Sequence, residues 1–148
     1  MRLVVLRSQS EARDALSYLR QEVHCASAMT PSGGAADGVA VSSMTLTLPS
    51  GCFRPASETA GTPSTWCTVL VSANRYALYR KAGATCDNTG KLFADYLTNA
   101  NPFTPYAQTT SRLGYLNIQF VVDTNSQSLS PNAYRLTDDI VLRNTTRS

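Results

Sequence analysis

The side chains that could perform acid–base catalysis are few in this sequence. His24 is the only histidine, so a Ser-His-Asp or Cys-His catalytic site would have to use it. No nucleophile motif such as G-x-S-x-G occurs, and the stretch "GGAADG" (33–38) lacks the Lys-Ser/Thr of a phosphate-binding loop. A histidine near the end of a helix more often interacts with the helix dipole or with solvent. The sequence therefore predicts a protein that is not an enzyme and that has neither catalytic residues nor a cofactor.

Asp138 and Asp139 are the only adjacent acidic residues. In a strand, neighbouring side chains point to opposite faces, so these two cannot form one carboxylate dyad. Calcium prefers several oxygen ligands, and a calcium ion held by Asp138, Asp139 and nearby loop oxygens stays open as an alternative. Because the D-x-D-x-D spacing of a calcium loop is missing, our first interpretation is that there is no metal site.

Aromatic and basic residues offer little support for nucleic-acid binding. The net charge is +3 and the pI is about 8.8, with basic residues spread from Arg2 to Arg147. Aromatic residues on strands are more often core or cross-strand pairs than platforms for bases. A nucleic-acid partner is therefore neither excluded nor indicated. The aromatic candidates are Trp66, Tyr76, Tyr79, Tyr96, Tyr106 and Tyr115.

Four cysteines, Cys25, Cys52, Cys67 and Cys86, indicate the compartment of the protein. They form no CxxC motif, and their even number in a Ser-, Thr- and Asn-rich chain predicts two disulfides in an exported protein. Four free thiols in a cytosolic protein remain the alternative. Three pairings are open, and we favour Cys52–Cys67 with Cys25–Cys86, because Cys52 and Cys67 flank the loop 50–65. A glycosylation sequon at 144–146 would matter only in a eukaryotic secretory route.

An amphipathic helix is expected over residues 1–29, since apolar residues recur every three or four positions from Ala12 onward. Its start has two interpretations. Ser8 and Glu11 have the spacing of a capping box, which would begin the helix at Ser8. Alternatively, the helix begins at residue 2 and the apolar residues at 3–6 form its first turn. The cluster 31–34, which contains a proline and two glycines, ends it.

Alternating apolar residues follow the helix and predict an antiparallel sheet in residues 39–148. We expect a bulge near 42–43, an irregular or short helical segment at 89–103, and loop structure around Pro102 and Pro105. The whole chain then forms one α+β domain, 1–148, in which the helix packs on a sheet of about five strands. The expected strands are 39–48, 66–72, 75–80, 113–123 and 134–144.

The order of these elements resembles a known family. The stretches that carry the resemblance are "LRQEVHCASAM", "MTLTLPSGC", "WCTVLVSANRYALYR", "FADYLT", "LGYLNIQFVVD" and "YRLTDDIVLRN". Together they are similar to type IV pilin-like proteins, in particular the minor pseudopilin-like, prepilin-type proteins of Gram-positive bacteria. The resemblance implies a structural subunit of a type IV pilus or a type II-like pseudopilus, with other pilin or pseudopilin subunits as partners. Filament assembly, secretion, adhesion or DNA uptake would be its uses.

The sequence departs from that family at its N-terminus. The family begins with a basic leader, a Gly-Phe-Thr-Leu-x-Glu-like processing motif and roughly 20 apolar residues, the length of a membrane span. None of these is present, and no secretory signal is visible. We therefore expect membrane association only through a missing N-terminal segment. A truncated chain, a start codon assigned too late and a soluble relative all remain open.

A second function is kept beside the first. The chain could be a secreted or cell-surface binding module, adhesin-like, that uses an exposed sheet face and the loops 50–65 and 99–112. Both functions place the protein outside the cytoplasm, at the cell surface or beyond it.

Overall fold

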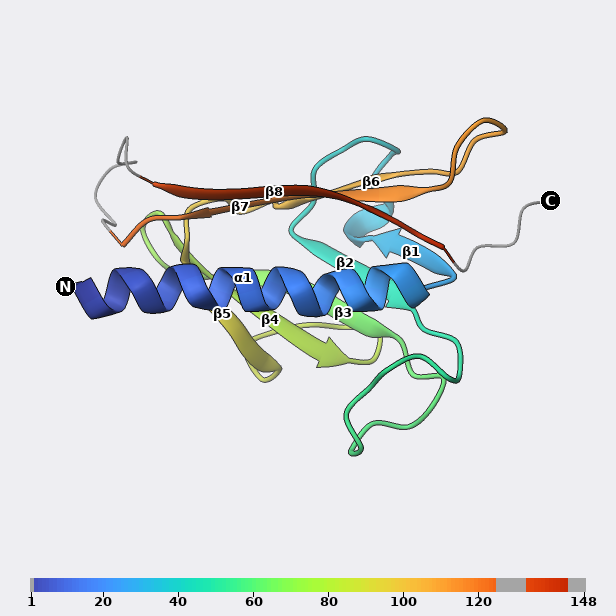
Figure 1. Cartoon of the computed structure of the whole chain (residues 1–148), viewed down its shortest axis with the longest axis horizontal. Coiled ribbons are helices and arrows are strands. Elements are labelled where there is room, and N and C mark those ends of the chain that lie inside the picture. The colour runs from blue at the N-terminus through green and yellow to red at the C-terminus, as the bar shows by residue number, and fades with distance from the viewer. Residues whose placement is uncertain (1, 125–132, 144–148) are drawn as a thin grey trace.

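The computed structural model describes residues 2–124 and 133–143, with side chains from Leu6 onward. One helix, α1 (Arg2–Cys25), precedes eight strands and a short 3-10 turn, η1 (Ser32–Gly34). Figure 1 shows the helix lying lengthwise between β5 on one side and β8 on the other. The strands are β1 (Ala28–Pro31), β2 (Ser43–Thr47), β3 (Ser64–Ser72), β4 (Arg75–Ala82), β5 (Lys91–Leu97), β6 (Phe103–Tyr106), β7 (Tyr115–Val122) and β8 (Tyr134–Val141).

Helix α1 runs without a break from Arg2, so the capping-box start at Ser8 is wrong. Ser8 is 2% exposed and lies within the helix, one turn before the buried Ala12. The helix ends at Cys25, earlier than the expected residue 29. It ends there because the following residues 28–31 pair with β2 as strand β1. The Ser27 N–H already donates to the Thr47 carbonyl at 2.9 Å.

The strands form a single, strongly curled antiparallel sheet, a half-barrel, in the order β1-β2-β3-β4-β5-β7-β6 with β8 on β7. The expected α+β fold with about five strands is therefore wrong. Three short strands account for most of the difference. Strand β1 (28–31) lies where the sequence predicts the end of the helix. Strand β5 (91–97) lies where it predicts an irregular or helical stretch, and β6 (103–106) where it predicts a loop that contains proline.

Two of the three missed strands have a local feature that is untypical of a strand. The four apolar residues of β5 have helix-like spacing, and Tyr96 near its end has a φ of 62°, outside the extended region. Strand β6 contains Pro105, which lacks an N–H donor. The Pro105 carbonyl accepts the Gly38 N–H at 2.8 Å, and in a strand the N–H of a residue points to the same side as its carbonyl. The missing N–H would therefore face Gly38, and the pairing with β7 loses no donor.

The β3–β4 hairpin confirms the expected pairing, and strands β7 and β8 confirm the expected alternation of burial. Asn74 turns the hairpin with a φ of 57°, in the left-handed region that asparagine adopts more readily than most residues, and the strand register shifts between Leu70 and Ser72. The change of parity near 42–43 has a different cause from the expected bulge. Val41 forms an isolated bridge to Phe103 of β6, whereas β2 begins at Ser43 and pairs with β3. The residues before and after positions 42–43 therefore pair with different strands, β6 and β3.

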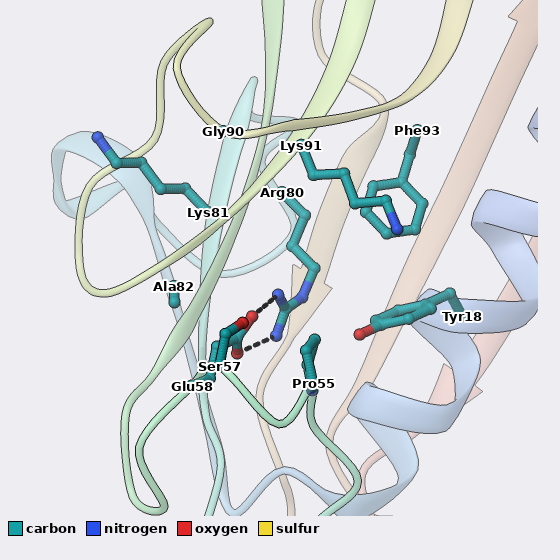
Figure 2. A pocket seen from close by; sticks show the side chains of 10 residues that line it. All are labelled: Tyr18, Pro55, Ser57, Glu58, Arg80, Lys81, Ala82, Gly90, Lys91 and Phe93. Carbon is teal, nitrogen blue, oxygen red and sulfur yellow. Dashed lines mark hydrogen bonds and ion pairs between the residues drawn. The ribbon is translucent and has the colours of Figure 1, made fainter.

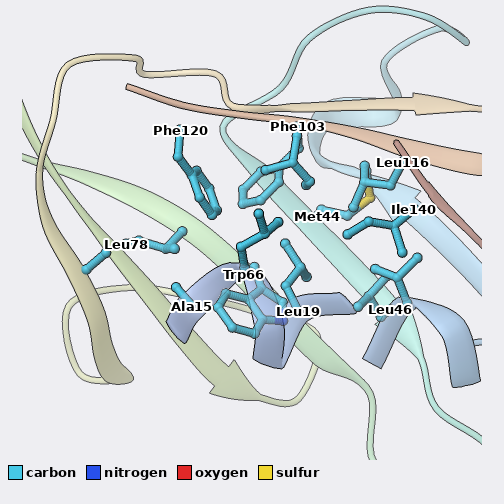
Figure 3. Close-up of a cluster of buried hydrophobic side chains, with 14 of the residues drawn as sticks. Ala15, Leu19, Met44, Leu46, Trp66, Leu78, Phe103, Leu116, Phe120 and Ile140 are labelled. Carbon is cyan, nitrogen blue, oxygen red and sulfur yellow. The ribbon is translucent and has the colours of Figure 1, made fainter. Parts of the chain in front are cut away.

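The core lies in the hollow of the half-barrel, where the buried stripe of α1 meets the concave face (Figure 3). Burying one large apolar side chain contributes roughly 1.5–3 kcal/mol, so the helix and the sheet stabilise each other. The largest buried side chains include Trp66, Phe103, Phe120, Leu19, Leu46, Leu78, Leu116 and Ile140.

Candidate functional site

A carboxylate interrupts the apolar stripe of helix α1. Glu22 is 2% exposed and lies between the buried Leu19 and Val23. Its Oε1 accepts hydrogen bonds from Ser64 Oγ at 2.7 Å and from Trp66 Nε1 at 2.8 Å. A buried charge also needs a charged partner, because leaving water is costly for an ion. That partner comes from β4.

Arg80 of β4 pairs with two carboxylates at once. Its Nε donates to Glu22 Oε2 at 2.7 Å, and its two terminal nitrogens donate to the oxygens of Glu58 at 2.6 and 2.9 Å. Burial alone would lower the pKa of Arg80, but the hydrogen bonds to Glu58 and the charge of Glu22 outweigh it and raise that pKa. The same hydrogen bonds from Arg80 lower the pKa of Glu58. Arg80 and Glu58 are therefore both charged at neutral pH.

A cavity of about 460 Å³ opens above this network, between the helix, the loop 50–65 and the β4–β5 hairpin (Figure 2). Glu58 and Arg80 both line the cavity, and Glu58 is the more exposed of the two, with 14% of its side chain accessible against 4% for Arg80. The cavity is large enough for a small-molecule ligand. Its lining residues are Tyr18, Pro55, Ser57, Glu58, Arg80, Lys81, Ala82, Gly90, Lys91 and Phe93.

Aromatic rings form one wall of the cavity. The ring centroids of Tyr18 and Phe93 are 5.0 Å apart, and the buried Trp66 supports Phe93 from behind at 4.8 Å. Phe53, which is 61% exposed, extends this wall outward with its ring 5.9 Å from that of Tyr18. Burial raises the pKa of Tyr18, so its hydroxyl stays protonated at neutral pH. Lys91 places its Nζ 5.2 Å from the centre of the Phe93 ring.

Gly90 allows the β4–β5 hairpin to close on one side of the cavity. A Cβ at this position would lie 2.7 Å from the Arg80 carbonyl oxygen, which is closer than side-chain carbons approach backbone oxygens. A residue with a side chain would therefore move β5 away from β4 and reshape the cavity.

The loop 50–65 is fastened at several points, although it has no helix or strand before β3 begins at Ser64. A disulfide joins Cys52 to Cys25 at the helix end. Arg54 donates to the carbonyls of Thr59 at 2.8 Å, Thr62 at 3.1 Å and Leu48 at 3.3 Å. With the Glu58–Arg80 pair, these contacts hold the loop in one position beside the helix. A site built on a fastened loop is preorganised for binding.

The four cysteines form two disulfides, as expected, but the favoured pairing was wrong. The structure joins Cys25 to Cys52 and Cys67 to Cys86. Cys67 lies inside β3 opposite Tyr79, and the loop that follows β4 returns Cys86 to the same place, with its Sγ 3.6 Å from the Tyr79 carbonyl oxygen. Two disulfides indicate an extracellular or secreted protein.

The residues singled out for chemistry do not form one site. His24 is half-buried at the helix end, where burial and the charges of Arg143 and Arg20 lower its pKa. Asp138 pairs with Arg20 at 2.6 Å, whereas Asp139 accepts a hydrogen bond from Asn117 Nδ2 at 2.8 Å. Within residues 2–124 and 133–143, no three His, Cys, Asp or Glu side chains gather as a metal site would require. The sequon at 144–146 lies outside the described residues.

The two loops proposed for binding lie on opposite sides of the molecule (Figure 1). The loop 50–65 borders the large cavity, whereas Pro105 and Ala107 of the segment 99–112 border a separate cavity of about 210 Å³. Near the latter, the rings of Tyr106 and Tyr115 stack at 4.6 Å. The aromatic residues considered for base stacking therefore do not form one row, since Trp66 is buried in the core.

The sequence analysis missed the Glu22–Arg80–Glu58 network. One signal was available, because Glu22 occupies an inward position of an otherwise apolar stripe. Its partner stands 58 residues further along the chain, and no local pattern connects the two.

Comparison with models of protein families, with curated protein sequences and with solved structures gave no match to this chain. Across the part of the chain that the structure describes, no helix has both the length and the apolar character needed to cross a membrane.

Proposed function

We propose that this protein is an exported, non-enzymatic structural subunit of a type IV pilus or type II-like pseudopilus. The curled sheet is not the sheet expected of that family and gives the proposal no support. The observation that carries it is the helix, whose N-terminal turns extend beyond the sheet (Figure 1). Such turns are available to pack against neighbouring subunits.

The helix has two parts that differ in exposure, a stretch that packs on the sheet and an N-terminal end that projects from it. From Ser8 to Val23, one side of the helix is buried against the half-barrel. Leu6, which is one of the apolar residues of the first turns, is 60% exposed. An apolar side chain on a projecting helix end gains free energy when a partner covers it.

Site-specific photo-crosslinking tests this proposal. A photoreactive amino acid replaces Leu6 in cells that produce the protein, and the crosslinked partners are identified by mass spectrometry. We expect partners that are filament subunits or copies of this chain. Leu70 is the matched control, because it is 61% exposed but lies on strand β3. Equal crosslinking from both positions, or none from position 6, would contradict the proposal.

The proposed membrane association requires an apolar segment outside the present sequence, and the coding DNA upstream of Met1 tests for it. An in-frame extension with a Gly-Phe-Thr-Leu-x-Glu-like motif and an apolar stretch would support the filament role. An in-frame stop codon directly upstream would count against it.

The second candidate is a secreted binding module, and the cavity beside the loop 50–65 favours it. The cavity combines a fastened loop, an aromatic wall and a charged floor, and perturbed ionisable groups often mark functional sites. A thermal-shift screen with neutral sugars, acidic sugars, nucleotides and short peptides tests it. Stabilisation by any one class that is lost in Phe53→Ala would support a binding module, and no stabilisation by any class would argue against one.

A further inference from the structure

The cavity above Arg80 presents donors and acceptors together. The hydroxyls of Tyr18 and Ser57 can each donate and accept, the Lys91 ammonium donates, and the Glu58 carboxylate accepts. Figure 2 shows the Tyr18 hydroxyl directed toward Arg80 across the cavity. Within the described residues no hydrogen bond of the Tyr18 hydroxyl is found, so this group is available to a ligand.

Most charges at and beneath the cavity are paired within the protein. Arg80 is held between Glu22 and Glu58, and Lys81 lies 3.4 Å from Asp87. Arg54 also lies close enough to Glu58 for its charge to lower the pKa of that carboxyl. The formal charges are three negative, on Glu22, Glu58 and Asp87, and four positive, on Arg54, Arg80, Lys81 and Lys91. Because the difference is a single positive charge, the site concentrates ions little, and a neutral polar ligand is compatible with it.

Apolar surface lies beside the hydrogen-bonding groups of the cavity. Tyr18, Phe93 and the Pro55 ring line the cavity beside the polar groups, and the exposed ring of Phe53 lies next to Tyr18, with 5.9 Å between the ring centroids. These rings are held in place by Trp66 and by the Cys25–Cys52 disulfide, so binding orders few groups. The cavity therefore suits a ligand that combines several hydrogen-bonding groups with an apolar face.

We propose that this cavity binds a neutral pyranose sugar, as a unit of a surface glycan. A pyranose ring has this combination, with an edge of hydroxyls and a face of C–H groups. The proposal rests on the second candidate function and names its ligand class, and it does not depend on the filament role. A subunit with such a site would connect its assembly to a glycan-coated surface.

The test is isothermal titration calorimetry of the full chain with its disulfides intact. The probes are the methyl glycosides of glucose, galactose, mannose and N-acetylglucosamine, with maltose and cellobiose as longer ligands. We expect at least one neutral probe to bind with one-to-one stoichiometry. Tyr18→Phe removes only a hydroxyl, and Phe53→Ala removes an exposed ring, so both variants should fold. Each should weaken binding by about three- to tenfold.

Leu70→Ala is the matched control, since Leu70 is as exposed as Phe53 but lies on strand β3, whereas Phe53 packs against the lining residue Tyr18. It should leave binding unchanged. Binding that is equal in the wild type, Tyr18→Phe and Phe53→Ala would overturn the proposed site. Binding of glucuronic acid without any neutral sugar would overturn the ligand class. If peptides or nucleotides alone bind, the sugar proposal fails and the binding module survives, whereas no binding by any class removes both.

Discussion

Two ion pairs join helix α1 to the sheet, and they differ in how much water reaches them. Glu22 meets Arg80 of β4 with side-chain exposures of 1% and 4%, and Arg20 meets Asp138 of β8 with exposures of 45% and 29%. The shortest N–O distances are similar, at 2.7 and 2.6 Å. The two ion pairs therefore have similar distances, but one is buried and the other is exposed to solvent. A buried pair is costly to break, because the remaining charge has no water, whereas an exposed pair contributes little.

The largest expected effect comes from Arg80→Met, which keeps most of the side-chain volume and removes the charge. Glu22 would then be a buried carboxylate without a cation, and we expect a loss of roughly 3–5 kcal/mol in the free energy of unfolding. Urea denaturation with the disulfides intact measures it. The double variant Glu22→Gln/Arg80→Met keeps an acceptor for Trp66 and should recover a large part of the loss. If the double variant is as unstable as the single one, packing rather than charge explains the effect.

A smaller effect is expected from Glu58→Gln, which removes one carboxylate but leaves Arg80 paired with Glu22. Hydrogen bonds to charged groups contribute about 1.5–3 kcal/mol, so we expect a loss in that range at pH 7. The folded pKa of Glu58 lies below its ordinary value of 4.5. Its contribution is therefore present above the unfolded pKa and is lost as the pH falls through the folded pKa.

Unfolding measured between pH 7 and pH 3 tests the role of Glu58. The difference in stability between the wild type and Glu58→Gln should shrink across the acidic part of this range. A difference that stays constant down to pH 3 would show that the Glu58 charge does not stabilise the loop.

The smallest effect is expected from Asp138→Asn, which breaks the exposed pair with Arg20. We expect a loss of about 0–1 kcal/mol, and the loss should decrease further in 1 M NaCl, where the Debye length is about 3 Å. Denaturation at low and high salt measures it. If Asp138→Asn lost more free energy of unfolding than Glu58→Gln, the exposed pair would contribute more than expected, and the comparison between the buried and the exposed pair would be wrong.

The parts of the fold that were predicted correctly depend on neighbours in the sequence. The helical stripe from Ala12 to Val23, the turn at Asn74 and the alternation of β7 and β8 are local patterns. The missed parts depend on distant partners. Strand β6 is defined by pairing with β7 and with Val41, and a four-residue segment with a proline has no strand pattern of its own.

The candidate site was predicted less well than the fold for the same reason. Loop 50–65 was predicted to take part in binding because of its composition, not because of any contact. The structure shows that it borders the cavity. Glu22 was visible as a charge on an apolar face, whereas Arg80 and Glu58 look like ordinary surface residues in the sequence. The disulfide pairing failed because Cys67 lies well inside β3 rather than at the strand end next to Cys52.

The Cys25–Cys52 disulfide determines how a mechanical force on the helix would be transmitted. It connects the last residue of α1 to the segment after β2. A pull on the N-terminal end of the helix, parallel to its axis, is resisted along the half-barrel by side-chain contacts in shear. At its C-terminal end the helix continues through two residues into the edge strand β1, and the disulfide adds a second covalent connection. Tension on the helix would therefore be shared between β1 and the segment after β2, rather than being carried by the edge strand alone.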